Sequence, residues 1–150
     1  LFGCTNGATI KNLGLTGVSV NGDEFNGALA GRVLSSGTID ACFSTGQVSG
    51  AGYYTYAGGL IGYAQANLSN CFSTAQVFYT GSYPGHLGYC MGGLTGGFYQ
   101  GTVSCCYSTG EVTGSTYVGG LNGSNGTGVF NSCYWNNGHW HWGSDDYHIR

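Results

Sequence analysis

Apolar residues recur along this chain at intervals close to 28 residues, separated by small and polar residues. The triplet Leu-x-Gly marks each recurrence, and its five copies lie 28, 31, 34 and 27 residues apart. Its leucines are Leu1, Leu29, Leu60, Leu94 and Leu121. A second apolar position follows at Ile10, Ile39, Leu68, Val103 and Phe130. Three residues further on stand Leu13, Cys42, Cys71, Cys106 and Cys133. Self-similarity at such a period is typical of repeat proteins.

Each repeat consists of short apolar and polar stretches between Gly, Ser, Asn and Thr turns, and none keeps a helical period. One such coil cannot bury its own apolar residues, so coils must stack on one another. We therefore predict an all-β, right-handed parallel β-helix of about five coils of roughly 28 residues with three strand faces. The recurring Leu, second apolar and Cys positions become columns of its core.

A short motif accompanies the columns. The strings GGLIG, GGLTG and GGLNG surround three of the leucines, and the runs CFSTG, CFSTA and CYSTG follow three of the second apolar positions. In these features the chain resembles the GLUG-motif repeat family from Leu1 to about Trp135. The resemblance implies a repeat segment of a secreted or surface bacterial protein that is adhesin-like, with a structural or binding role.

The repeats predict one solenoid over residues 1–135, with coils starting near positions 1, 27, 58, 92 and 119. Residues 136–150 are rich in His and aromatic side chains and depart from the repeat. We expect them to form a C-terminal cap or contact segment, because the terminal coils of a solenoid need covering.

Charge is scarce, at 6% of residues, and the net charge is −3 with only three Lys and Arg. Nucleic-acid binding requires many basic side chains, so we expect none. No apolar run reaches the roughly 18 residues that a membrane span requires. Seven cysteines in 150 residues favour an oxidising compartment, and we expect an extracellular or cell-surface location.

The cysteine column allows two interpretations. Directly stacked residues lie within disulfide reach, but their side chains point in parallel, so the thiols either pack freely or include at least one bridge. Cys105 precedes Cys106 on a strand and must face the other way. We expect it to pair with Cys90 in the long insertion between the third and fourth repeats, while Cys4 has no evident partner.

Several surface residues are candidates for binding. Tyr53, Tyr54, Tyr56, Trp140 and Trp142 are expected to mediate self-association or glycan binding, since exposed aromatic rings serve both purposes. His139, His141 and Asp145 are weak candidates for a metal site, which we rank below a capping role. Glycosylation sequons begin at Asn67, Asn122 and Asn125.

No catalytic motif or cofactor-binding motif is present in the sequence. We therefore expect a non-catalytic extracellular module of a surface fibre or adhesin, which stacks end to end with itself or with neighbouring modules of a longer chain. A carbohydrate-binding adhesin module is the alternative interpretation. Ice binding by the recurring Ser-Thr pairs is a remote one.

Overall fold

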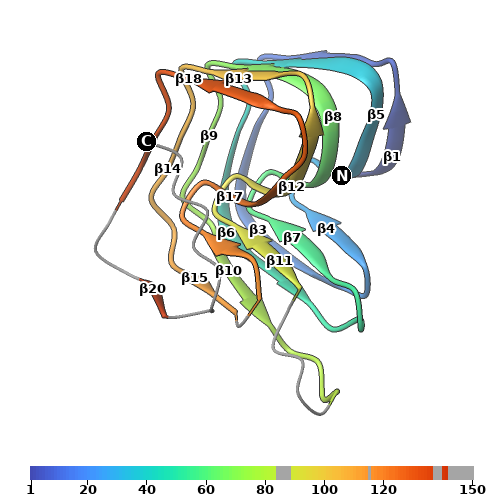
Figure 1. Cartoon of the computed structure of the whole chain (residues 1–150), viewed down its shortest axis with the longest axis vertical. Coiled ribbons are helices and arrows are strands. Elements are labelled where there is room, and N and C mark those ends of the chain that lie inside the picture. The colour runs from blue at the N-terminus through green and yellow to red at the C-terminus, as the bar shows by residue number, and fades with distance from the viewer. Residues whose placement is uncertain (84–88, 115, 137–139, 142–150) are drawn as a thin grey trace.

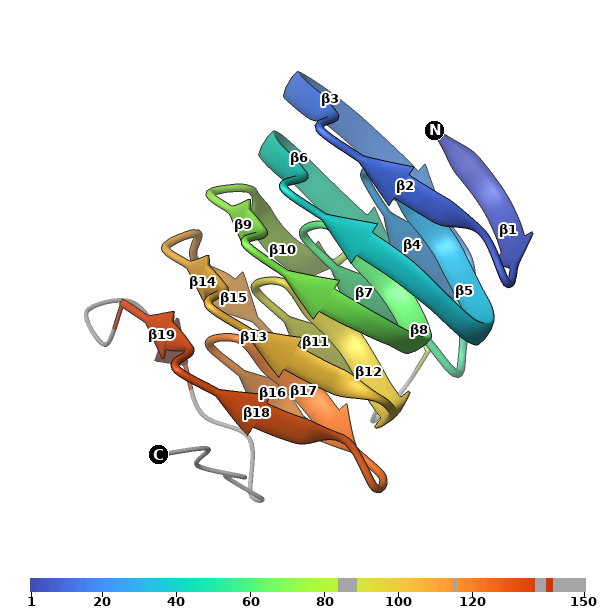
Figure 2. The same ribbon diagram turned by 90° about the horizontal axis from the view of Figure 1, so that it is seen from above.

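The computed structural model describes residues 1–83, 89–114, 116–136 and 140–141. The chain folds into an all-β parallel solenoid (Figures 1 and 2). The solenoid has about four turns of roughly 29 residues. This confirms the predicted fold class. The five leucine landmarks enclose four complete turns, which is why the turn count is one lower than the number of motif copies. The right-handed sense stays a prediction.

Three parallel sheets form the walls, and every turn contributes strands to them. The first sheet has the order β1 (Phe2–Asn6), β5 (Ala30–Asp40), β8 (Ile61–Ser69), β12 (Thr95–Gln100) and β17 (Asn122–Asn125). Its remaining strands are β2 (Thr9–Lys11), β13 (Thr102–Ser104) and β18 (Val129–Asn131). The second sheet contains β3 (Gly14–Gly22), β6 (Phe43–Gly50), β9 (Phe72–Ser73), β10 (Gln76–Tyr79), β14 (Tyr107–Ser108), β15 (Val112–Thr113), β19 (Tyr134–Trp135) and β20 (Trp140–His141). The third has the order β16 (Val118–Gly119), β11 (Cys90–Gly92), β7 (Tyr56–Gly58) and β4 (Phe25–Gly27).

Equivalent residues of successive turns pair in register, so the sequence columns are also columns in space. Ile39, for example, pairs with Ile10 on one side and with Leu68 on the other. The repeated Leu, second apolar and Cys positions form one buried cluster between the first and second sheets.

A separate cluster lies between the second and third sheets. Its larger members are Val48, Val77, Met91, Val112 and Val118. The interior is therefore divided into two lobes, and the second sheet contributes to both. The repeat length alone does not predict this division.

The glycine pair and the Ser-Thr run of the motif meet inside the first lobe. Ser44 is fully buried, and its hydroxyl donates a hydrogen bond of 2.7 Å to the carbonyl oxygen of Gly59. One turn further on, a Cβ atom placed on Gly93 would lie only 2.7 Å from Oγ of Ser108. The second glycine of the pair therefore leaves room for the serine, and the serine satisfies a backbone carbonyl near the glycine turn.

A corner of each turn has left-handed backbone geometry. The residue between the first and second sheets has φ between 51° and 56° in every turn, at Asn12, Ala41, Asn70, Cys105 and Ser132. Asn tolerates this region well, whereas most other L-residues do not. The corner explains why the cysteine pair splits, since Cys105 forms the turn while Cys106 enters the core.

Candidate functional site

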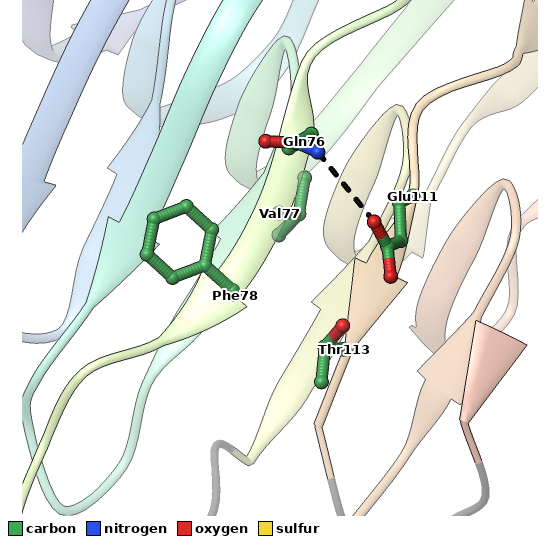
Figure 3. A pocket seen from close by; sticks show the side chains of 5 residues that line it. All are labelled: Gln76, Val77, Phe78, Glu111 and Thr113. Atoms are coloured by element: carbon green, nitrogen blue, oxygen red, sulfur yellow. Dashed lines mark hydrogen bonds between the residues drawn. The ribbon is translucent and has the colours of Figure 1, made fainter. Parts of the chain in front are cut away.

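A shallow hollow of about 140 Å³ lies on the outer face of β10 and β15 (Figure 3). Gln76 donates a hydrogen bond of 3.5 Å to the carboxylate of Glu111 beside it, and Val77, Phe78 and Thr113 complete the lining. Asp40 lies on β5 of another sheet, where it accepts hydrogen bonds from Ser69 and Asn70. Asp40 and Glu111 therefore do not form a carboxylate pair suited to acid–base chemistry.

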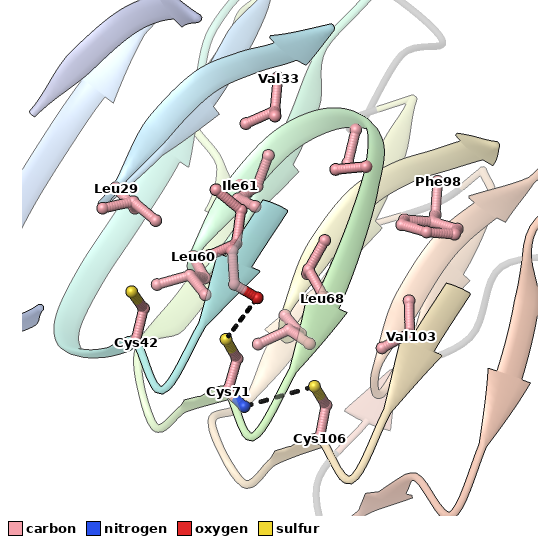
Figure 4. Close-up of a cluster of buried hydrophobic side chains, with 14 of the residues drawn as sticks. Leu29, Val33, Cys42, Leu60, Ile61, Leu68, Cys71, Phe98, Val103 and Cys106 are labelled. Carbon is pink, nitrogen blue, oxygen red and sulfur yellow. Dashed lines mark hydrogen bonds between the residues drawn. The ribbon is translucent and has the colours of Figure 1, made fainter. Parts of the chain in front are cut away.

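All seven cysteines are free thiols in the structure. Cys42, Cys71 and Cys106 are buried in the first lobe, as Figure 4 shows, and Cys133 is half-buried at the end of their column. The Cys106 thiol donates to the carbonyl of Ser104 at 3.1 Å. The pKa of the Cys106 thiol is raised, mainly by a hydrogen bond with the Cys71 side chain and secondly by burial. The same hydrogen bond lowers the pKa of Cys71, so these two thiols are coupled, and the column packs as part of the core.

The expected disulfide between Cys90 and Cys105 is corrected by the structure. Cys90 lies on β11, is fully buried beside Tyr56 and Ser124, and burial raises the pKa of its thiol to about 12. Cys105 is exposed at the corner between β13 and β14. The two residues occupy different walls, because the insertion ends before Cys90 and the chain has already re-entered the third sheet there.

Aromatic rings stack along the outer face of the second sheet. The rings of Phe43, Phe72 and Tyr107 are parallel to within 1°, with centroids 4.8 and 4.9 Å apart. Tyr134 continues the column in register and is 70% exposed. Because neighbouring rings cover each other's faces, this ladder presents mainly ring edges to solvent. A hollow of about 260 Å³ adjoins its end, between Tyr107 and Trp135.

A second aromatic cluster joins the first and third sheets on the outside of the solenoid. Phe25 and Tyr56 of the third sheet stack at 5.4 Å, and Tyr63 and Tyr99 of the first sheet stack at 4.9 Å. The edges of these stacks meet, since the rings of Phe25 and Tyr63 lie 5.9 Å apart at 85°. Arg32 lies against this cluster, with Cζ 4.8 Å from the Phe25 ring centroid.

The predicted tyrosine contacts divide between the surface and this cluster. Tyr53 and Tyr54 are 45% and 56% exposed, whereas Tyr56 is half-buried, with burial and a hydrogen bond with Tyr99 raising its pKa. Arg32 was not singled out from the sequence as a site residue. The only available signal was that Arg32 is one of three basic residues in the chain.

The two ends of the stack expose apolar side chains. Leu1 and Phe2 are 68% and 40% exposed at the first turn, and Val129 is 53% exposed at the last. Core positions of the first turn, including Leu13, are only half-buried. No described strand pairs with the outer edge of β1.

A protein-family model matches part of the chain. Residues 53–77 match the model of the GLUG motif. The chain therefore carries a GLUG motif. This confirms the resemblance over that segment, which contains a glycine pair, the buried Leu60, and the inward-facing Cys71 and Ser73. No curated protein and no solved structure matches the chain significantly.

The sequons of the GLUG solenoid differ in accessibility. Asn67 and Asn125 are exposed, whereas Asn122 is buried, and its side-chain carbonyl accepts a hydrogen bond of 2.8 Å from Thr95. The buried amide cannot carry a glycan in the folded protein, so Asn122 is removed from the candidates.

The structure describes only part of the segment that holds the predicted tail contacts and the weak metal candidates. His139, Trp142 and Asp145 lie outside the described residues, and Trp140 and His141 are described only as β20, which pairs with β15. Within the described part of the chain, no three His, Cys, Asp or Glu residues converge on a possible metal position. No helix among those residues could span a membrane.

Proposed function

We propose that this GLUG solenoid is a non-catalytic structural module that joins further copies of itself end to end, in a fibre or adhesin outside the cell. The observation that carries the proposal is that both ends display the same columns that pair inside the stack. The extracellular location is supported by the cysteine content and by the resemblance to surface-protein repeats.

The columns fix how two copies would meet. Thr9, Thr38, Asn67, Thr102 and Val129 occupy equivalent positions on the first sheet. A second copy that continues the stack in register places its Thr9 beside Val129 of the first. The same register brings Ile10 to Phe130 and Leu13 to Cys133.

Strand edges that have no partner in the described part of the chain favour such growth, because they offer a row of free backbone donors and acceptors. Natural edges are usually protected by charged residues, and Lys11 is the one charged side chain among residues 1–20. The contact joins different surfaces of the two copies, so it does not close on itself and extends into a filament.

The experiment is a charge swap at this predicted contact. The wild-type chain should form filaments in negative-stain electron microscopy and large species in light scattering. The double variant Thr9→Lys, Val129→Lys should remain monomeric, because like charges would face each other. The combination Thr9→Glu, Val129→Lys should restore assembly, because the two residues can then form an ion pair across the junction.

Thr74→Lys is the matched control, since Thr74 is an exposed threonine like Thr9 but follows β9 in an inner turn of the solenoid. It should assemble like the wild type. A wild-type chain that stays monomeric at high concentration, or filaments lost in the Thr74 variant but kept in the double-lysine variant, would contradict the proposal.

A further inference from the structure

We propose that the corner around Arg32 binds a carboxylate-bearing sugar, such as a uronic acid unit of an acidic polysaccharide. This inference does not rest on end-to-end assembly, because Arg32 lies on the side wall of the solenoid. It has four supports: an unpaired cation, aromatic rings that hold it, a row of hydroxyl groups beside it, and an open edge next to it.

Arg32 faces outward from β5, since its neighbours Gly31 and Val33 are buried on the core side. Its guanidinium lies 4.8 Å from the centroid of Phe25 and 5.9 Å from that of Tyr63. These contacts orient the planar group without neutralising it.

The charge of Arg32 has no counterion in the described part of the chain. Lys11, the other described basic side chain, pairs with Asp40 at 3.9 Å, whereas Arg32 forms no ion pair there. Its Nε is buried and has no hydrogen-bond partner among the described residues. A half-buried, ring-held guanidinium without an anion is a ready partner for a carboxylate, which accepts two parallel N–H bonds.

Hydroxyl groups continue from Arg32 along the solenoid axis. The Tyr63 hydroxyl accepts a hydrogen bond of 3.2 Å from Gln65, and the Tyr56 and Tyr99 hydroxyls lie 3.2 Å apart. Ser124 extends the row, 3.5 Å from the Tyr99 hydroxyl. These groups are half-buried and can both donate to and accept from sugar hydroxyls.

No described strand covers the edge beside Arg32. β4, which carries Phe25, is the terminal strand of the third sheet. On the side of the first turn, Arg32 pairs with Cys4, an exposed small residue. In the unassembled chain, a ligand can therefore reach the guanidinium from the side of the first turn, the end that the proposed assembly would cover.

The composition of the corner distinguishes between ligand classes. A nucleic acid would need several cations, and only one is present. A neutral sugar would use the rings and hydroxyls but leave the guanidinium unpaired. Asp23 and Glu24 precede Phe25 and add negative charge nearby, so a highly charged polyanion is disfavoured relative to a sugar chain with one carboxylate per unit.

The test is calorimetric titration with tetragalacturonic acid and with its methyl ester, which has the same sugar rings but no charge. The acid should bind the wild-type chain about tenfold or more tightly than the ester, as expected for a charged hydrogen-bonded pair. Arg32→Gln should reduce acid binding by a similar factor. Arg32→Lys should fall between the two, because lysine keeps the charge but loses the planar stacking.

Lys11→Gln is the matched control, since it removes the other described cation from a different part of the first sheet, and it should bind like the wild type. Far-UV circular dichroism checks that each variant is folded. Undetectable acid binding, equal binding of acid and ester, or an unchanged Arg32→Gln variant would overturn the proposal. Equally tight binding of a tetra-aspartate peptide would also overturn it, because the corner would then recognise anions without recognising sugars.

Discussion

The left-handed corners make a quantitative prediction about stability. Two of the five corner residues are Asn, whereas Ala41, Cys105 and Ser132 hold φ of 51° to 52° without an amide side chain. This region costs most L-residues about 1–2 kcal/mol, and Asn reduces that cost. Replacing Ala41 with Asn should therefore raise the free energy of unfolding by about 0.5–1 kcal/mol. All three positions are exposed, so no core packing changes.

The assay is thermal and urea unfolding followed by circular dichroism. A gain of that size corresponds to an increase in Tm of about 1–4 °C for a chain of this length. Ala41→Gly should gain less, because glycine also raises the entropy of the unfolded chain. Ala41→Val should lose stability, because a β-branched residue is strained in this region.

Two comparisons make the reasoning refutable. Ala8 is not among the residues with positive φ, so Ala8→Asn should not stabilise the protein. Asn70→Ala should destabilise it by about 1 kcal/mol or more, since the variant also loses the 3.0 Å hydrogen bond to Asp40. If Ala41→Asn lowers the stability, or if Ala8→Asn raises it equally, backbone strain does not govern the corner.

Three further predictions concern single side chains. In the native protein, a thiol reagent should modify the exposed Cys105 rapidly and reach the buried Cys106 only after unfolding. A hydrogen bond from Asn70 lowers the pKa of Asp40, so Asn70→Ala should raise that pKa in an NMR titration. The Asp40 carboxylate stabilises the folded chain at pH values above its unfolded pKa, and this contribution is lost as pH falls through its folded pKa. Asn70→Ala brings these two pKa values closer together, so the stability of the variant should change less with pH between them. Leu94→Ala should cost about 2–5 kcal/mol in urea unfolding, because Leu94 is fully buried.

The sequence predicted the stack and its columns because parallel pairing in register repeats one environment in every turn. A residue type that recurs at Leu29, Leu60 and Leu94 must therefore occupy one place in the core. The prediction that Cys105 and Cys106 face different ways was right, but its reason was wrong, because both residues lie at the corner between β13 and β14 and not on a strand.

The same reasoning failed where the chain passes from one sheet to the next. Alternation distinguishes two sides of a strand, but it does not say whether the other side faces solvent or a second lobe. Cys90 illustrates this, because the sequence analysis assigned it to a surface insertion and it is buried on β11. The recurring serines, which ice binding would require at the surface, are also buried, at Ser44, Ser73 and Ser108. Ser44 and Ser108 donate to the carbonyls of Gly59 and Gly120, which lie 15 and 12 residues away in the sequence.

The columns of this solenoid differ in how strictly they repeat one residue type. The core column keeps leucine in successive turns, because each turn must present the same surface to the next. The column that contains Arg32 instead reads Cys4, Arg32, Tyr63, Gly97 and Ser124, with five residue types at five successive positions. Stacking does not require that variation, and Gly97 even leaves the space that the rings of Tyr56 and Tyr99 fill. Columns that repeat therefore account for the stacking of the turns, and a ligand site is to be sought in the columns that do not.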